Sequence, residues 1–257
     1  MADLESPIRW RNGTRDVADR TLADEVPVAI VANGATVAVL LATPADLDDL
    51  ALGFALTEGL IAHAADADVE VVPHADGIEA RLSLPDSGAL VARRRTITGP
   101  SGCGLCGIES LAAALRPPRV VAAPGPRPTP VEIIAAIGAL GEAQPLGRRT
   151  RAVHGAALWR RGEPLIVRED VGRHNALDKL TGAVAGAATG DAMLLLTSRV
   201  SVEMVQKASV LGTPIIVAVS APTRLAVATA AASGLTLIAV ARADGFEVFT
   251  GAERVAW

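Results

Sequence analysis

Residues 193–220 read MLLLTSRVSVEMVQKASVLGTPIIVAVS, and their two ends are almost entirely apolar. Runs such as LLLT and IIVAVS are typical of strands buried on both faces of a sheet. We therefore predict strands over residues 193–197 and 214–220, with a helix over residues 202–211 between them. A strand, a helix and a second strand in this order favour a βαβ crossover between parallel strands.

The same alternation continues on both sides of this segment. Downstream, residues 225–232 are predicted as a helix, and LTLIAVA over residues 235–241 as another buried strand. The remaining elements are short strands over residues 153–158, 165–167 and 247–249 and helices over residues 130–140 and 175–185. The pattern predicts a three-layer α/β domain with mostly parallel strands.

The first third of the chain has a different pattern. Residues 26–31 and 36–41 are β-branched runs joined through Asn33-Gly34, a strong hairpin signal, and a second hairpin is expected over residues 69–84. A helix is expected over residues 44–61. Six of the 16 prolines lie between positions 117 and 130, which indicates a linker. We therefore expect a smaller α+β domain over residues 1–118 and an α/β domain over residues 119–257.

Composition excludes several classes of function. The chain has 24 Lys+Arg against 28 Asp+Glu, with 2% aromatic residues and no Tyr, so neither a basic surface nor a base-stacking surface for nucleic acid is expected. Only two basic residues are lysines, Lys179 and Lys207, which we interpret as a compositional habit of the source. Residues 1–20 contain no apolar core of a signal peptide, and the apolar stretch 227–241 is interrupted by polar residues. A cytoplasmic protein without a membrane span is expected.

Both cysteines of the chain lie in the glycine-rich segment TGPSGCGLCG, residues 98–107. The glycines around Cys103 and Cys106 remove side-chain bulk and allow unusual backbone angles. Residues 108–115 are predicted to be helical, which would place Cys106 near a helix N-terminus, where the helix dipole lowers a thiol pKa. This argument favours Cys106 as the more reactive thiol.

Three interpretations of the cysteine pair remain open. The pair could be structural, it could be half of a zinc site completed by His154 and His174, or it could perform redox or persulfide chemistry. A zinc deaminase is not supported, because that chemistry requires an H-x-E upstream of the cysteines. The upstream histidines, His63 and His74, have no glutamate two residues later.

A second candidate site is REDVGRHNALDK, residues 168–179, at the corner between a predicted strand and helix. Arg173, His174 and the free N–H groups at the helix start could bind an anion or a phosphate. The alternative is a helix whose orphan amides are capped by Asp170 and Asn175, with no ligand.

Two more strand-to-helix corners are polar, TSRVS over residues 197–201 and SAPTR over residues 220–224. Ligands of open α/β sheets bind at the carboxyl ends of the strands, so these corners and the Arg173–His174 corner could line one crevice for a phosphorylated or nucleotide ligand. No Walker or GxGxxG motif is present.

Taken together, these motifs resemble the formate dehydrogenase accessory sulfurtransferases, the family called FdhD or NarQ. The matching segments lie in the family's order, and EDVGRHNALDKL and SRVSVEMVQKA are the most specific of them. The segments are DLALGFALTEGLI (49–61), SGCGLCG (101–107), EDVGRHNALDKL (169–180), SRVSVEMVQKA (198–208), and VSAPTRLAVATA with GLTLIAVAR (219–242).

The resemblance implies a fold and a function. The fold would be a cytidine-deaminase-like C-terminal domain without the zinc site, in a homodimer. The function would be to carry sulfur as a persulfide from a cysteine desulfurase to the molybdenum or tungsten of a bis-(molybdopterin guanine dinucleotide) cofactor, bound as a substrate and destined for formate dehydrogenase.

By motif match, Cys103 would carry the persulfide and Cys106 would be its partner. The cofactor would be bound by the turn after the last long strand and by the three corners. These residues are Val240, Ala241, Arg242, Ala243, Asp244, Gly245, Arg173, His174, Ser198, Arg199 and Ser220. Two other functions stay open: a non-catalytic chaperone that escorts the cofactor, and a dithiol oxidoreductase.

Overall fold

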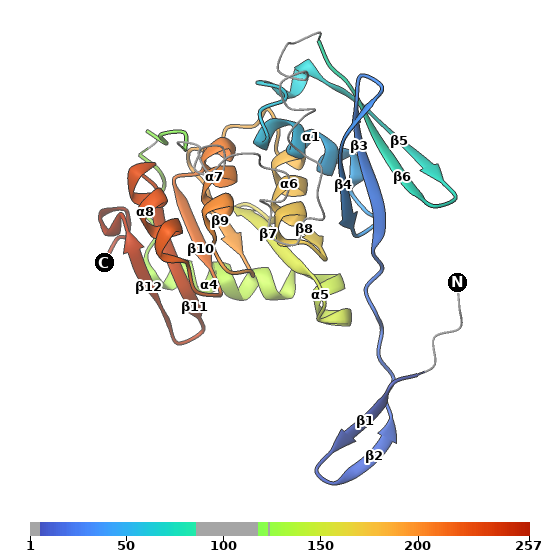
Figure 1. Ribbon diagram of the computed structural model, residues 1–257. Coiled ribbons are helices and arrows are strands. Elements are labelled where there is room, and N and C mark those ends of the chain that lie inside the picture. Colours follow the sequence, from blue (N-terminus) through green and yellow to red (C-terminus); the bar gives the residue numbers. More distant parts are fainter. Residues whose placement is uncertain (1–5, 86–117, 123) are drawn as a thin grey trace.

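The computed structural model describes residues 6–85, 118–122 and 124–257 (Figure 1). The two principal sheets have six and four strands, and a separate ribbon has two. Helices cover the six-stranded sheet, which confirms the predicted α/β class. The predicted boundary at residues 118/119 lies at the edge of the undescribed stretch and stays a prediction.

The six-stranded sheet has the order β12-β11-β10-β9-β7-β8. The three apolar runs of the sequence form β9, β10 and β11, which are parallel neighbours as expected. The other three neighbouring pairs are antiparallel, so the expectation of a mostly parallel sheet is wrong. The physical reason is that β7–β8 and β11–β12 are hairpins, and short connections permit only antiparallel pairing. The strands are β7 (His154–Trp159), β8 (Ile166–Asp170), β9 (Met193–Leu196), β10 (Ile215–Ala218), β11 (Thr236–Arg242) and β12 (Gly245–Thr250).

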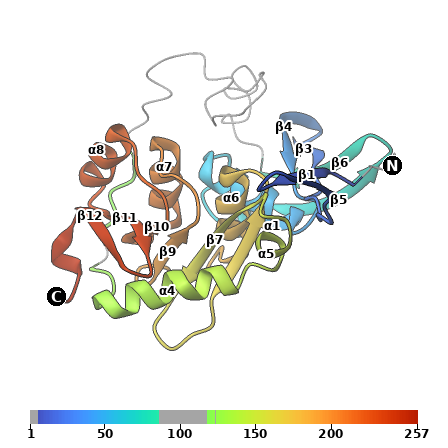
Figure 2. The same ribbon diagram turned by 90° about the horizontal axis from the view of Figure 1, so that it is seen from below.

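Helices lie on both faces of this sheet, as Figure 2 shows. Along β9, Leu194 and Leu196 pack in one core with α6, α7 and α8, whereas Met193 and Leu195 pack in the opposite core with α4. This alternation follows from the two-residue period of a strand. The predicted three layers are therefore confirmed. The helices are α4 (Pro130–Glu142), α5 (Pro145–Thr150), α6 (Arg173–Ala183), α7 (Val202–Leu211) and α8 (Arg224–Ala232).

The four-stranded sheet has the order β4-β3-β6-β5, and α1 (Leu47–Thr57) covers one of its faces. Both predicted hairpins are present. Asn33 and Gly34 have φ values of 46° and 76°, the left-handed conformation that a two-residue hairpin turn of type I′ needs. The strands are β3 (Val26–Ala32), β4 (Ala35–Ala42), β5 (Asp68–His74) and β6 (Gly77–Ser83).

The two sheets are joined through the crossing of α1 and α6 (Figure 1). A Cβ atom at Gly53 would overlap the carbonyl oxygen of Asp178, and one at Gly182 would overlap that of Asp49. Glycine at both positions therefore lets the two backbones touch. This contact brings α1 against the corner that holds the second candidate site.

The proline-rich segment packs against the C-terminal part of the chain. The N–H of Arg119 donates to Ser209 Oγ at 3.2 Å, and the N–H of Val121 donates to the carbonyl of Ser233 at 2.9 Å. Val121 is itself buried in the core beside α7 and α8. Arg119 and Val121 are thus fixed on this surface.

Two strands and one α-helix of the described chain were not predicted. Strands β1 (Ile8–Arg11) and β2 (Thr14–Val17) form a ribbon turned at Asn12-Gly13, a hairpin signal that sequence reasoning overlooked. Helix α5, which has a proline in its first turn, was also missed. Among the described residues, no helix is long and apolar enough to span a bilayer.

Candidate functional site

One edge of the six-stranded sheet collects the polar corners that the sequence singled out. Strands β8, β9, β10 and β11 run in one direction, because β7 is antiparallel to both of its neighbours and β9–β11 are parallel. Their carboxyl ends therefore lie at one edge. The amino end of β7, which starts at His154, lies at the same edge. Binding sites of open α/β sheets occur at such edges.

Backbone hydrogen bonds hold these corners side by side. Thr223 N–H donates to the carbonyl of Val200 at 2.9 Å, and Val240 N–H donates to the carbonyl of Ser220 at 3.4 Å. Thr197 Oγ1 accepts from the N–H of Gly155 at 2.8 Å, which ties β9 to the start of β7. The expected adjacency of the corners is observed, and their binding role stays a prediction.

Most of the β8–α6 corner is structural. Asp170 is fully buried and accepts hydrogen bonds from the N–H of Gly172 at 2.8 Å and from the N–H of Thr43 at 3.0 Å. Its carboxylate also pairs with Lys179 at 2.6 Å. The alternative in which Asn175 caps the helix is not observed, because the N-cap of α6 is Gly172 with no side-chain cap hydrogen bond. Asn175 Nδ2 instead donates to Asp170 and to the carbonyl of Leu41.

Arg173 and His174 differ from the rest of this corner. Arg173 Nε and His174 Nε2 are buried and have no hydrogen-bond partner among the described residues. Burial, followed by the positive charges of Lys207 and Arg173, lowers the pKa of His174 to about 3. His174 is therefore neutral at physiological pH. Two buried polar atoms without partners are unusual and mark these side chains as candidates for binding a ligand.

His154 belongs to the same cluster, although sequence reasoning named it only as a possible zinc ligand. Burial and the charges of Arg173 and Arg199 lower its pKa, while Asp170 opposes this effect. His154 in turn contributes to the low pKa of His174. His154 lies at this edge because β7 is antiparallel to both of its neighbours, and the sequence alone does not reveal that strand order. The guanidinium groups of Arg173 and Arg199 therefore give this edge a positive charge beside the two imidazoles.

The β9–α7 corner adds further open groups. Ser198 is buried and its Oγ donates to the carbonyl of Arg199 at 3.1 Å, so this hydroxyl is already engaged, whereas Arg199 is exposed. Ser201 Oγ and Glu203 Oε2 are buried without a hydrogen-bond partner in the described structure. Sequence reasoning did not name either residue as a site residue.

Residues 240–245 do not form a single surface. Val240 has a φ of 53° at an irregularity in the β11–β12 pairing, a rare conformation for a β-branched residue. Ala241 is buried in the core beside α4, whereas Arg242, Ala243 and Asp244 are exposed at the turn before β12. Of this stretch, the backbone of Val240 has the direct hydrogen bond to the Ser220 corner.

The two lysines of the chain lie directly behind this site. Lys207 Nζ donates to both carboxylate oxygens of Asp178 at 2.9 Å and to Thr57 Oγ1 at 2.9 Å, and it lies 5.8 Å from the ring centre of Phe54. Although burial opposes its charge, Asp178 and Glu58 raise the pKa of Lys207. Lys207 therefore stays charged and acts on His174.

Lys179, which lies in α6, forms a second buried ion pair. It is fully buried, pairs with Asp170 and donates to the carbonyl of Thr43 at 2.9 Å. Lys207 therefore links α7 to Thr57 in α1, and Lys179 links α6 to Thr43, which precedes α1. Both lysines of the chain are therefore buried in ion pairs at this junction.

Cys103 and Cys106 lie outside the described residues, so their relation to this edge is not described. Within residues 6–85, 118–122 and 124–257, no group of three or more His, Cys, Asp and Glu side chains could hold a metal ion. His154 and His174 are close enough to influence one another, but no third ligand joins them there. The zinc interpretation requires both cysteines, so it stays an open alternative.

Comparison with known proteins agrees with the resemblance seen in the motifs. The chain is 49% identical over 251 residues to the sulfur carrier protein FdhD of Agrobacterium fabrum, covering 95% of this chain and 93% of that protein. It is 46% identical over 244 residues to the protein of the same name from Brucella abortus, covering 93% and 91%.

A solved structure has the same fold. The crystal structure of a putative formate dehydrogenase accessory protein from Desulfotalea psychrophila matches with a TM-score of 0.75 and 28% identity, over 98% of this chain and 97% of that one. A model of the FdhD/NarQ family matches residues 23–256. The chain belongs to the FdhD/NarQ family.

Proposed function

We propose that this chain is a cytoplasmic sulfur carrier and sulfurtransferase for the maturation of formate dehydrogenase. Sulfur would arrive from a cysteine desulfurase as a persulfide on Cys103. It would leave to the molybdenum or tungsten of a bis-(molybdopterin guanine dinucleotide) cofactor, which is bound as a substrate. Two copies of the chain would act as a homodimer. Family membership supports the sulfur-carrier role, because relatives at up to 49% identity bear that name.

The cluster of partnerless polar atoms at the strand-end edge is the observation that favours an anionic substrate. Arg173 Nε and Ser201 Oγ are buried donors without acceptors among the described residues, and His174 Nε2 is a third open atom. Burying such atoms without partners costs about 1–3 kcal/mol each, so a ligand that hydrogen-bonds to them would be strongly favoured.

The charge of this edge suits the phosphates of a guanine dinucleotide. Arg173 follows β8 and Arg199 follows β9, so both lie at this edge, and both lower the pKa of His154. The proposed phosphate ligands are these two arginines, His174 and the Ser198 and Ser220 corners, with residues 240–245 as a neighbouring wall. Guanidinium groups recognise phosphate oxygens through paired, charge-assisted hydrogen bonds.

The loading step would be a thiolate exchange. The Cys103 thiolate attacks the terminal sulfur of the desulfurase persulfide, an S–S bond forms on Cys103, and the desulfurase cysteine leaves as a thiolate. The sulfur can be delivered by two balanced routes. In the first, the acceptor metal supplies two electrons, the terminal sulfur is transferred to the metal as sulfide, and Cys103 returns to a thiolate. In the second, the Cys106 thiolate attacks Cys103 Sγ, sulfide is released, and a Cys103–Cys106 disulfide remains.

The first experiment is the intact mass of the purified chain after incubation with a cysteine desulfurase and cysteine. We expect a gain of one sulfur that reductant reverses, that Cys103→Ala abolishes and that Cys106→Ala retains. If Cys103→Ala still gains the sulfur and Cys106→Ala does not, the roles of the two thiols are reversed, as the helix-dipole argument favours. A protein that gains no sulfur but binds the cofactor would be a chaperone.

A second experiment tests the strand-end edge by itself. Arg173→Ala should weaken binding of a guanine nucleotide at least about tenfold while the persulfide still forms on Cys103. A matched control is Arg127→Ala, which removes an exposed arginine that precedes α4 and lies outside the proposed ligand set. Turnover of a generic disulfide substrate would instead favour the dithiol oxidoreductase.

A further inference from the structure

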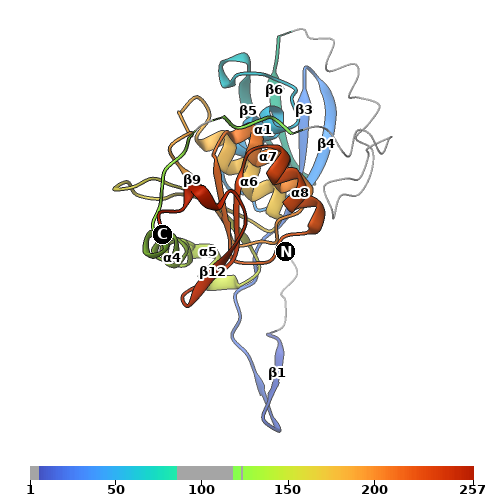
Figure 3. The same cartoon turned by 90° about the vertical axis from the view of Figure 1, so that its left-hand side faces the viewer.

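The ribbon of β1 and β2 stands away from the rest of the described chain (Figures 1 and 3). All eight of its strand residues are exposed. A two-stranded ribbon is at best marginally stable alone in water, and stability normally requires packing on a further surface. The family match begins at residue 23, so this ribbon lies outside the part of the chain that defines the family.

The two faces of the ribbon have opposite character. Cross-strand pairing sets Ile8 opposite Val17 and Trp10 opposite Arg15, so these four side chains share one face. Ile8, Trp10 and Val17 are 59%, 72% and 68% exposed. The other face contains the Arg9–Asp16 ion pair, with Arg9 Nε donating to Asp16 Oδ1 at 2.9 Å. Such alternation is typical of a sheet that buries one face.

The outer face of the four-stranded sheet, on the side away from α1, also exposes apolar side chains. Val39 and Leu41 on β4 are each 58% exposed. In the strand register, Val39 pairs with Ala29, which in turn pairs with Glu79. Arg81 pairs with Glu70, so apolar and charged side chains lie on the same face. Residues of the core with α1, such as Ile30 and Ala80, point the other way.

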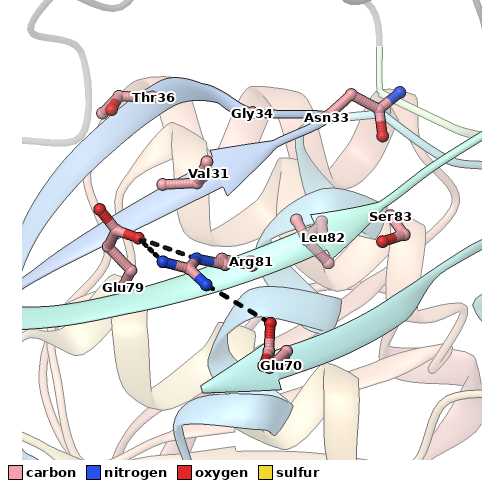
Figure 4. A pocket seen from close by; sticks show the side chains of 9 residues that line it. All are labelled: Val31, Asn33, Gly34, Thr36, Glu70, Glu79, Arg81, Leu82 and Ser83. Carbon is pink, nitrogen blue, oxygen red and sulfur yellow. Dashed lines mark hydrogen bonds and ion pairs between the residues drawn. The ribbon is translucent and has the colours of Figure 1, made fainter. Parts of the chain in front are cut away.

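A hollow of about 420 Å³ lies on this face (Figure 4). Arg81 lies across it and is held by Glu79 at 2.8 Å and by Glu70 at 3.6 Å. Val31 forms part of its wall. A hollow with an apolar wall and a fixed guanidinium suits an aromatic side chain, because a guanidinium stacks on an indole face.

The charges of the two surfaces are also complementary. On the face of the ribbon that carries Trp10 the charged side chain is Arg15, and the outer face of the sheet carries Glu70 and Glu79 around Arg81. Opposite charges favour encounter of the two surfaces, whereas two ribbons or two outer faces would repel. Each chain therefore presents a donor and an acceptor of the same contact.

We infer that the β1–β2 ribbon of one chain docks on the outer face of the four-stranded sheet of a second copy, with Trp10 in the hollow beside Arg81. Two-fold symmetry would make this contact twice per dimer, which doubles the buried surface. The inference rests on the proposed homodimer and is independent of the proposed sulfur chemistry.

The test is the dimer dissociation constant of the full chain by sedimentation velocity, from about 1 to 100 µM. Trp10→Ser and Val39→Asp change exposed residues on the two sides and should each weaken the dimer at least about tenfold. Arg11→Ser, on the polar face of the ribbon, and Leu225→Asp, an exposed leucine on α8, are the matched controls and should change it less than about twofold. A wild-type chain that stays monomeric, or a dimer that Trp10→Ser leaves intact, overturns the inference.

A cross-link identifies the occupant of the hollow. A photoreactive phenylalanine in place of Trp10, in a mixture of isotopically heavy and light protein, should give heavy–light cross-links to peptides containing residues 27–41 or 70–83. Cross-links within single chains only would mean that the ribbon docks on its own sheet and would overturn the proposal. Persulfide formation on Cys103, measured on the same variants, is expected to be unchanged, so failure of one proposal is distinct from failure of the other.

Discussion

Protonation of His174 should make the fold sensitive to acid. In the folded chain, burial and the charges of Lys207 and Arg173 lower the pKa of His174 from 6.5 to about 3. Between these two values the unfolded chain binds a proton that the folded chain does not, so stability falls as pH falls. Each pH unit well below 6.5 costs about 1.4 kcal/mol, and His174 alone should remove about 3 kcal/mol between pH 8 and pH 4.5.

The assay is urea denaturation of wild type and of His174→Gln at pH 8, 6.5, 5.5 and 4.5. Glutamine keeps a polar side chain but does not titrate, so the difference at pH 8 isolates its effect on packing. As the pH falls to 4.5, this difference should shift by about 3 kcal/mol in favour of the variant. Parallel pH profiles for the two proteins would refute the reasoning, since they would show that His174 protonates equally in the folded and unfolded chains.

Two more substitutions test the junction behind the site. Lys207→Met leaves Asp178 buried without its ion pair and should cost about 3–5 kcal/mol of unfolding free energy. Adding Asp178→Asn should recover part of this loss. A loss below about 1 kcal/mol in Lys207→Met would contradict a buried ion pair. In Lys207→Met, removal of the charge should also raise the pKa of His174, which an NMR titration of the imidazole would measure. Gly182→Ala forces a methyl group onto the backbone of Asp49 and should lower stability by about 1–3 kcal/mol or more, whereas Gly138→Ala, with open space around its Cα, should be neutral or stabilising in thermal melts.

Local sequence patterns predicted most elements of the fold. The helix expected over residues 202–211 is α7 with the same bounds, and the two expected hairpins turn at Asn33-Gly34 and at Ala75-Asp76. These signals act over a few residues, so they can be read from one sequence. The mixed strand directions were missed because pairing partners are set by tertiary contacts that no local pattern records.

The junction behind the site could not be predicted for a related reason. Lys179 meets the carbonyl of Thr43 across 136 positions of sequence, and Lys207 meets Thr57 across 150. A lysine in an amphipathic helix is normally exposed, so its burial is evident only when the partner segment is placed against it. Likewise, His154 lies at the site only because β7 is antiparallel to β8 and β9.

The β8–α6 corner shows how one short motif can serve both structure and chemistry. Asp170, Asn175 and Lys179 use their polar atoms to fix residues 41–43 against α6. Because those atoms are already engaged, they are not available to a ligand. Arg173 Nε and His174 Nε2, between them in sequence, remain without partners in the described structure. A ligand that satisfies these two atoms would meet groups whose positions are set before it arrives, which lowers the entropic cost of binding.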